Sequence, residues 1–257
     1  MSSKTTLYLS NFLSFLFGKL CFIQWPYLLK PLVLRFFQGL FRINLSESVE
    51  QHRDFKSVND MFTRTLRPEC RTWEQQTTMI CSPVDGQFKG MCYGNSATIR
   101  VKSADYNVKS LLGTSHTADI DNMVLVNLYL SPQDCHHIFS PCDVTIQHIT
   151  YIPGPLLPVN PIVAKIIPTL FSTNERIVLT VQHKNTTFYI VLVGALNVGH
   201  MTLPSVPGFA SNQLKKHVEQ HLKIAHPELK KGDRLGTFNL GSSVLLLFDQ
   251  DAVTLPE

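Results

Sequence analysis

Several features that mark common classes of protein are missing from this chain. Its six cysteines contain no C-x-x-C pair and no zinc-like spacing with histidine, so scattered thiols are expected rather than a metal site. The N-terminal uncharged run, Thr5 to Gly18, is too short to span a bilayer. A twin-arginine signal is absent, and no small-x-small cleavage site follows that run. We therefore expect a protein that faces the cytosol.

Acidic residues are absent before Glu47, although five basic residues occur there: Lys4, Lys19, Lys30, Arg35 and Arg42. Apolar residues in this region recur at helical spacing, with breaks expected at Pro26 or Pro31. Two amphipathic helices of basic character can lie in an anionic membrane surface, and each cation adds about 1 kcal/mol. The alternative is that the apolar stripes pack on the core. We predict a membrane-associating segment over residues 1–45 and a peripheral membrane protein.

The remaining chain, residues 46–257, is predicted to form one domain of short strands separated by turns. Strands are expected at Val124–Leu130, and at 176–181 and 187–193 around a Lys184-Asn185 turn. Short helices are expected near 58–66 and 212–224. The predicted fold class is α+β, with N-terminal amphipathic helices followed by an antiparallel, barrel-like β core.

A glycine directly before a hydroxyl residue stands near the end of the chain, at Gly241-Ser242-Ser243. An alternating strand precedes it and an apolar run, 244–248, follows it. If the turn strains the peptide, the Ser242 hydroxyl can attack the Gly241 carbonyl, and the amide becomes an ester. Elimination and hydrolysis would then leave a pyruvoyl group, a ketone that can form a Schiff base with an amine and accept electrons. The alternative is a glycine bulge that enters a core strand.

Seven motifs together resemble the phosphatidylserine decarboxylase family, in order and at similar spacing over roughly residues 25–250. The motifs are Phe62-Thr63-Arg64, Ser82-Pro83-Val84-Asp85-Gly86, Leu130-Ser131-Pro132-Gln133-Asp134-Cys135-His136, Val159-Asn160-Pro161, Asn174-Glu175-Arg176, Val193-Gly194-Ala195-Leu196-Asn197-Val198-Gly199 and Gly241-Ser242-Ser243. Each motif alone is weak, whereas the ordered set is specific. The resemblance implies a pyruvoyl cofactor made from Ser242, with no metal and no pyridoxal phosphate.

The resemblance also implies roles for individual residues. Asp85 would orient and charge-balance the base, His136 would handle protons at the decarboxylating carbon, and Ser242 would be the nucleophile. The family's base is a histidine at the position occupied here by Phe139, which cannot accept a proton. His200 is the candidate replacement base, and His137 is a weaker one because adjacent strand residues face opposite sides.

The expected partners follow from the resemblance too: phosphatidylserine, an anionic membrane surface, the chain's own cleaved fragment 242–257, and a second copy in a homodimer, with no nucleic acid. Leu170 and Phe171 are expected to line a lipid entrance or to pack in the core. An inert, uncleaved family member that binds a lipid surface is the alternative function. A lipoyl-like carrier is disfavoured, because the strand-turn-strand repeats beginning at Ser82 and Ser140 have no lysine at their tips.

Overall fold

The computed structural model describes residues 12, 14–94, 98–101, 104–113, 122–159, 163, 166–167, 169–196, 200–212, 218–239 and 242–254, and only the main chain of 98–101 and 104–106. The helices are α2 (Lys30–Phe41), α3 (Val58–Phe62), α4 (Val108–Leu112) and α6 (Leu170–Thr173), with 3-10 turns η1 (Pro68–Cys70) and η2 (Gln250–Ala252). The strands are β1 (Gln87–Gly94), β2 (Thr98–Val101), β3 (Ala104–Asn107), β4 (Met123–Leu130), β5 (His137–Phe139), β6 (Val144–Ile152), β7 (Arg176–His183), β8 (Thr186–Val193), β9 (Met201–Thr202), β10 (Gln220–His221), β11 (Glu228–Leu229), β12 (Arg234–Phe238) and β13 (Ser242–Asp249).

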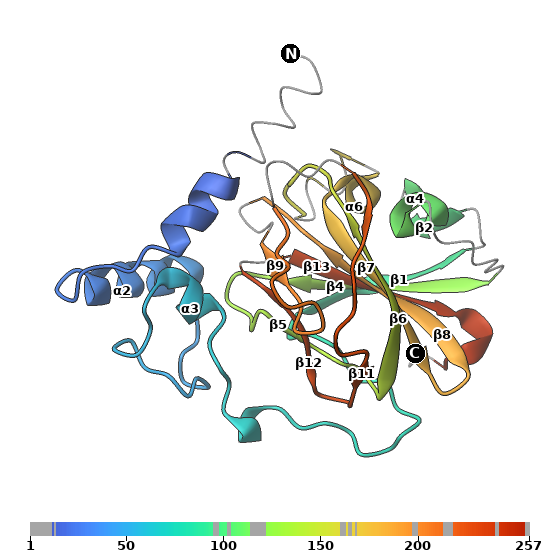
Figure 1. Ribbon diagram of the computed structural model, residues 1–257, viewed down its shortest axis with the longest axis horizontal. Helices are drawn as coiled ribbons and strands as arrows, with labels where there is room; N and C mark the ends of the chain where they lie inside the picture. The colour runs from blue at the N-terminus through green and yellow to red at the C-terminus, as the bar shows by residue number, and fades with distance from the viewer. Residues whose placement is uncertain are drawn as a thin grey trace, which may run out of the picture.

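Two antiparallel sheets form the body of the protein (Figure 1). The large sheet has the order β10-β6-β7-β8-β13-β4-β1-β2-β3, with β11 also paired to β6. The small sheet has the order β5-β12-β9. The predicted α+β class with an antiparallel core is confirmed. Among the described strands, the large sheet has two free edges, so it resembles a barrel only loosely.

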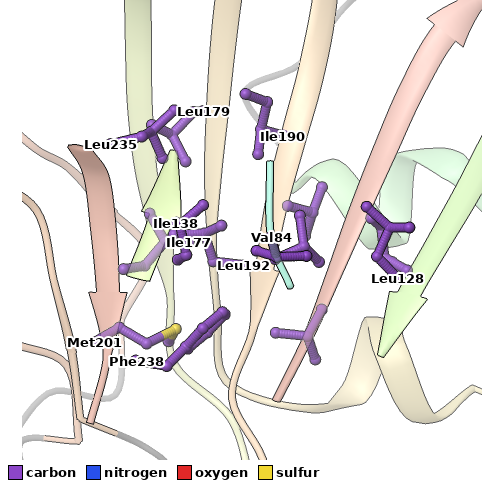
Figure 2. Close-up of a cluster of buried hydrophobic side chains, with 14 of the residues drawn as sticks. Val84, Leu128, Ile138, Ile177, Leu179, Ile190, Leu192, Met201, Leu235 and Phe238 are labelled. Atoms are coloured by element: carbon purple, nitrogen blue, oxygen red, sulfur yellow. The ribbon is translucent and has the colours of Figure 1, made fainter. Parts of the chain in front are cut away.

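The hydrophobic core lies between the two sheets. Figure 2 shows Ile138 and Phe238 of the small sheet in one cluster with Leu128, Ile177 and Leu192 of the large sheet. All five side chains are buried. Long runs of β-branched and leucine residues in β7, β8 and β13 make these central strands the buried part of the sheet.

The two copies of the predicted strand-turn-strand repeat lie side by side. The Phe139 N–H donates to the Pro83 carbonyl at 2.8 Å, and the Cys81 N–H donates to the Pro141 carbonyl at 2.9 Å. The first copy leads into β1 and the second into β6. The contact places Asp85, at the end of the first copy, near the strand that carries Phe139.

Helix α2 has one apolar side against the core and another exposed. Leu34 is buried, and the Phe41 ring packs edge-on against Phe62 of α3 at 5.3 Å between centroids. A second stripe, Leu28, Leu32, Phe36 and Leu40, is exposed at every position. One side of this segment therefore packs on the core, and the membrane association of the other side stays a prediction. Among the helices that the structure describes, none has the length and apolar character needed to cross a bilayer.

Two helix predictions differ from the structure. The first helix ends at Phe62 rather than near residue 66, and Ser57 caps it by accepting the Asp60 N–H at 3.2 Å. The helix expected over 212–224 is wrong at Gln220–His221, which form β10 and pair with β6. Residues 213–217 lie outside the described part. Hydrogen bonds to the β6 edge outweigh the local helical spacing, because propensity is a weak prior.

The lipid entrance expected at Leu170 and Phe171 is wrong. Both side chains are buried in the hydrophobic core, as part of α6. An apolar pair next to a polar Asn174-Glu175-Arg176 segment has the same sequence pattern whether it faces lipid or the interior. Only the packing of α6 separates the two.

Candidate active site

Ser242 begins β13, four residues after β12 ends at Phe238. It pairs across the sheet with Leu130, the last residue of β4. The side chain is 1% exposed, and within the described part of the chain its hydroxyl has no hydrogen-bond partner. Gly241 lies outside the described residues. A buried hydroxyl without a partner is costly to keep, and such groups occur at sites of function.

His136 follows a tight turn that is fixed by its own side chains. Asp134 accepts hydrogen bonds from the Ser131 N–H and hydroxyl, both at 2.7 Å. The His136 Nδ1–H donates to the Asp134 carbonyl at 2.8 Å, which assigns the lone pair to Nε2. Nε2 is buried and has no partner among the described residues. Burial lowers the pKa of His136 to about 3, so the ring is neutral at pH 7.

His137 and Phe139 share the other face of β5. His137 Nδ1 lies 3.1 Å from the Thr237 hydroxyl, and its ring centroid lies 6.3 Å from that of Phe139. Burial lowers the pKa of His137 to about 4. His137 thus lies on the same side of β5 as Phe139, and opposite to His136.

Asp85 is paired with an arginine. Arg71 donates from Nε to Oδ1 at 2.8 Å and from a terminal nitrogen to Oδ2 at 2.5 Å, and it also contacts Glu47 at 2.9 Å. These hydrogen bonds raise the pKa of Arg71. In the described residues, no hydrogen bond joins Asp85 to an imidazole. Phe139 packs edge-on against Trp73, 5.4 Å between centroids, beside this ion pair.

His200 belongs to a network with two asparagines. Asn239 Nδ2 donates to His200 Nδ1 at 2.8 Å and to the His200 carbonyl at 2.9 Å. Asn59 donates to Asn239 Oδ1 at 3.1 Å, which fixes the amide orientation. The Phe22 ring lies edge-on to His200 at 5.3 Å. Burial lowers the pKa of His200, and the neutral ring carries its proton on Nε2.

The Asn174-Glu175-Arg176 motif forms a buried polar cluster. Glu175 accepts from the Tyr151 hydroxyl at 2.5 Å and from the Asn212 N–H at 2.6 Å. Asn174 donates to the Gly194 carbonyl at 2.9 Å, and the Gly194 N–H donates to Glu175 O at 2.8 Å. Burial raises the pKa of Glu175 to about 7. This cluster fixes the end of β8 beside β13.

Three residues near the site were missed by sequence reasoning: Arg71, Asn239 and Arg64. Arg64 is buried and donates to the Gln133 carbonyl at 3.0 Å, in the turn before His136. Arg64 lies in a quoted motif, whereas nothing in the sequence singles out Arg71, fourteen residues before Asp85. Their pairing depends on tertiary contacts.

The residues present fit a group made from the chain itself. The Ser242 hydroxyl, buried and without a partner among the described residues, has the chemistry of a precursor for such a group. Among the described residues, no cluster of three or more His, Cys, Asp or Glu side chains is arranged to hold a metal ion. All six cysteines are free thiols.

Comparison with known proteins identifies the class. The family model for phosphatidylserine decarboxylase matches residues 58–256. The chain belongs to the phosphatidylserine decarboxylase family.

Its relatives include proteins named phosphatidylserine decarboxylase proenzyme from several bacteria. That of Herminiimonas arsenicoxydans is 35% identical over 229 residues, covering 86% of this chain and 76% of the relative. That of Helicobacter pylori strain J99 is 31% identical over 246 residues, covering 95% and 91%. That of Methylobacillus flagellatus is 34% identical over 249 residues, covering 93% and 86%.

Proposed function

We propose that this protein converts phosphatidylserine to phosphatidylethanolamine and carbon dioxide, after cutting itself between Gly241 and Ser242. The observation that carries the proposal is the buried Ser242 hydroxyl without a partner among the described residues, at the start of β13 in a chain of this family. The word proenzyme in the names of its relatives supports a cut chain.

The proposed self-cleavage balances without an outside oxidant or reductant. The Ser242 hydroxyl gives its proton to a base and attacks the Gly241 carbonyl; the C–N bond breaks, the nitrogen takes the proton, and an ester joins the two residues. Loss of the Ser242 Cα proton with breakage of the Cβ–O bond leaves a Gly241 carboxylate and dehydroalanine. Water then releases ammonia and leaves the pyruvoyl group.

In decarboxylation, the pyruvoyl group supplies an electrophilic carbonyl and an electron sink. We propose that His136, buried and neutral, handles a proton at the reacting carbon of the substrate. Asp85, which is paired with Arg71, would balance the charge of the base on the side of the site where Phe139 lies. His200 and His137 are the imidazoles that the sequence offers as replacement bases for self-cleavage.

The test uses two adjacent serines. Ser242→Ala should give a single uncut chain without decarboxylase activity, whereas Ser243→Ala should still yield fragments of about residues 1–241 and 242–257. Intact-mass measurement separates these outcomes, and a hydrazide probe should label only the small fragment, because only that fragment would carry a ketone. Cutting of Ser242→Ala at the unmutated rate would rule out Ser242 as the nucleophile.

We also propose that the N-terminal segment binds the cytosolic face of an anionic membrane. The exposed stripe Leu28, Leu32, Phe36 and Leu40 supplies apolar area, with Leu28 88% and Leu32 70% exposed. The basic residues of this segment supply attraction to anionic lipid. The substrate itself is an anionic lipid, so both interactions would direct the protein to it. Sedimentation would test the expected homodimer.

A second candidate function has an observation in its favour. Phe139 stands at the base position, and Asp85 is already neutralised by Arg71. An uncut family member that only binds a lipid surface would have this arrangement. Intact mass of the unmutated chain decides between the two, because only the enzyme requires a cut at Gly241-Ser242.

A further inference from the structure

Two buried polar atoms near the junction of β12 and β13 have complementary hydrogen-bonding roles. His136 Nε2 is an acceptor, because Nδ1–H is used by the Asp134 carbonyl. The Ser242 hydroxyl is a donor. Neither atom has a partner within the described part of the chain. Each unpaired group costs about 1–3 kcal/mol, so two of them at one junction require an explanation.

The His136 side chain points between the two sheets. Ile138 of β5 lies in the core cluster of Figure 2, and His136 precedes it by two residues, which is one full strand repeat. The pairing of β5 with β12 extends to His136, because the His136 carbonyl accepts the Phe238 N–H at 2.9 Å. Phe238, its cross-strand neighbour, also points into that cluster. Ile138 and Phe238 thus give the same direction, and the His136 ring packs edge-on against the buried Phe62 of α3, 5.6 Å between centroids.

The Ser242 side chain points into the same space from the large sheet. Val244 pairs with Leu128, and paired residues of antiparallel strands share a face. Leu128 lies in the core cluster of Figure 2. Ser242 is two residues before Val244, so it shares that face. Four residues of chain link it to Phe238, which limits the separation of their α-carbons to about 14 Å.

We propose that His136 Nε2 is the base that accepts the Ser242 hydroxyl proton in self-cleavage, in place of the imidazole missing at Phe139. The inference rests on the proposed function. The proton passes from the hydroxyl to Nε2 as the oxygen attacks the Gly241 carbonyl, and returns to the Ser242 nitrogen as the C–N bond breaks. The two atoms form no hydrogen bond in the structure, so the transfer requires that they approach each other or that a water joins them, as is common for catalytic contacts before reaction.

The other two imidazoles are less well arranged for this step. His137 points to the opposite face of β5, toward Thr237 and Phe139. His200 has its acceptor nitrogen occupied by Asn239, and its other nitrogen carries the proton. Of the three rings, His136 alone has an acceptor nitrogen that is both identified by its hydrogen bonds and buried without a partner among the described residues.

The test compares His136→Gln with His148→Gln, an exposed histidine of β6. Glutamine keeps a polar side chain but cannot accept a proton, so His136→Gln should slow self-cleavage on the order of a hundredfold or more. Hydroxylamine, which cuts esters, should release no fragment from it. His148→Gln should cut at the unmutated rate, and circular dichroism should report native folding of both.

A second measurement needs no variant. Burial keeps His136 neutral, and the positive charges of Arg64 and of a protonated His137 act in the same direction. The self-cleavage rate of the unmutated chain should therefore be constant from pH 6 to pH 8. A base with an ordinary imidazole pKa would give about a fourfold rise over that range. A rise of that size contradicts the assignment to His136.

The outcomes separate the inference from the function on which it rests. Normal cutting of His136→Gln, with decarboxylation lost, would overturn the inference and leave His136 in decarboxylation only. Loss of cutting confined to His200→Gln or His137→Gln would overturn it in favour of that ring. If the unmutated chain stays uncut, the proposed function is wrong, and the inference that rests on it is wrong too.

Discussion

At the scale of single residues, hydrogen bonds distinguish histidines that burial makes alike. His136 and His200 are both neutral at pH 7, because burial lowers both pKa values. The Asp134 carbonyl takes the Nδ1 proton of His136, whereas the Asn239 amide donates to Nδ1 of His200. The two rings therefore present opposite groups at Nε2, a lone pair in one and a proton in the other.

The buried titratable groups predict opposing effects of pH on stability. Below the ordinary imidazole pKa of 6.5, the lowered pKa values of His136 and His137 mean that only the unfolded chain gains their protons, so stability is lost as pH falls. Glu175 acts oppositely: its folded pKa, about 7, exceeds the ordinary 4.5, so stability falls as pH rises through that window. The two histidines outweigh the one carboxyl, so the melting temperature should rise from pH 5 to about pH 7 and level off above it.

Glu175→Gln isolates the carboxyl contribution. The amide keeps an acceptor for Tyr151 and Asn212 but cannot ionise, so the rise in melting temperature from pH 5 to pH 7 should become steeper. Glu228→Gln, exposed on β11, should keep the rise of the unmutated chain. If both variants keep that rise, the Glu175 carboxyl does not oppose it.

Phe139→His tests whether the family's arrangement can be restored. The new ring would lie beside Asp85, near Arg71 and Trp73. In a His136→Gln background, it should recover self-cleavage, measured by intact mass, because it supplies an imidazole at the position of the family's base. Phe139→Gln, which has no basic nitrogen, should recover nothing. Equal recovery by both would show that loss of the phenyl ring, not a base, is responsible.

At the scale of elements, the turn into β1 depends on close backbone contact. A Cβ added at Gly86 would lie 2.7 Å from the Tyr129 carbonyl oxygen of β4. Gly86→Ala should therefore lower the free energy of unfolding by roughly 1–3 kcal/mol, because main chain must move. Gly39→Ala, in α2 with no atom within 4 Å, should instead stabilise by up to about 1 kcal/mol. Urea unfolding measures both; equal effects would contradict the contact.

At the scale of the whole molecule, the exposed stripe of α2 should govern membrane binding. Leu28→Glu with Leu32→Glu removes apolar contact worth about 1.5–3 kcal/mol per side chain and adds repulsion, so flotation with phosphatidylserine vesicles should decrease sharply. Binding of the unmutated chain should weaken with salt. Because both side chains are exposed, the melting temperature should not change.

Tyr93→Glu supplies the matched control. Tyr93 is exposed on β1, and β1 lies on the side of the molecule away from α2 (Figure 1). The substitution adds one negative charge, against two in the Leu28 and Leu32 variant, to a different surface, so vesicle binding should remain close to that of the unmutated chain. A loss equal to that of the Leu28 and Leu32 variant would mean that charge alone, and not the stripe, determines binding.

The sequence by itself determined the features that depend on a local residue pattern or on the order of motifs along the chain. The strands at 124–130, 176–181 and 187–193 follow from runs of β-branched residues and a two-residue turn, and the family follows from seven motifs in order. The fold class and the predicted nucleophile Ser242 needed no more than this, although the role of Ser242 remains a prediction. The sequence also shows a phenylalanine at position 139, where the resemblance implies an imidazole, and that implied loss remains a prediction.

The tertiary structure alone decided which groups meet. The pairing of Asp85 with Arg71, the tautomer of His200, and the strand at Gln220–His221 depend on contacts between separate segments of the sequence. Local periodicity favoured a helix over 212–224 and allowed a lipid wall at Leu170 and Phe171. Packing against β6 and the core decided otherwise, because hydrogen bonds and burial contributed by distant residues exceed the small free energies of local propensity.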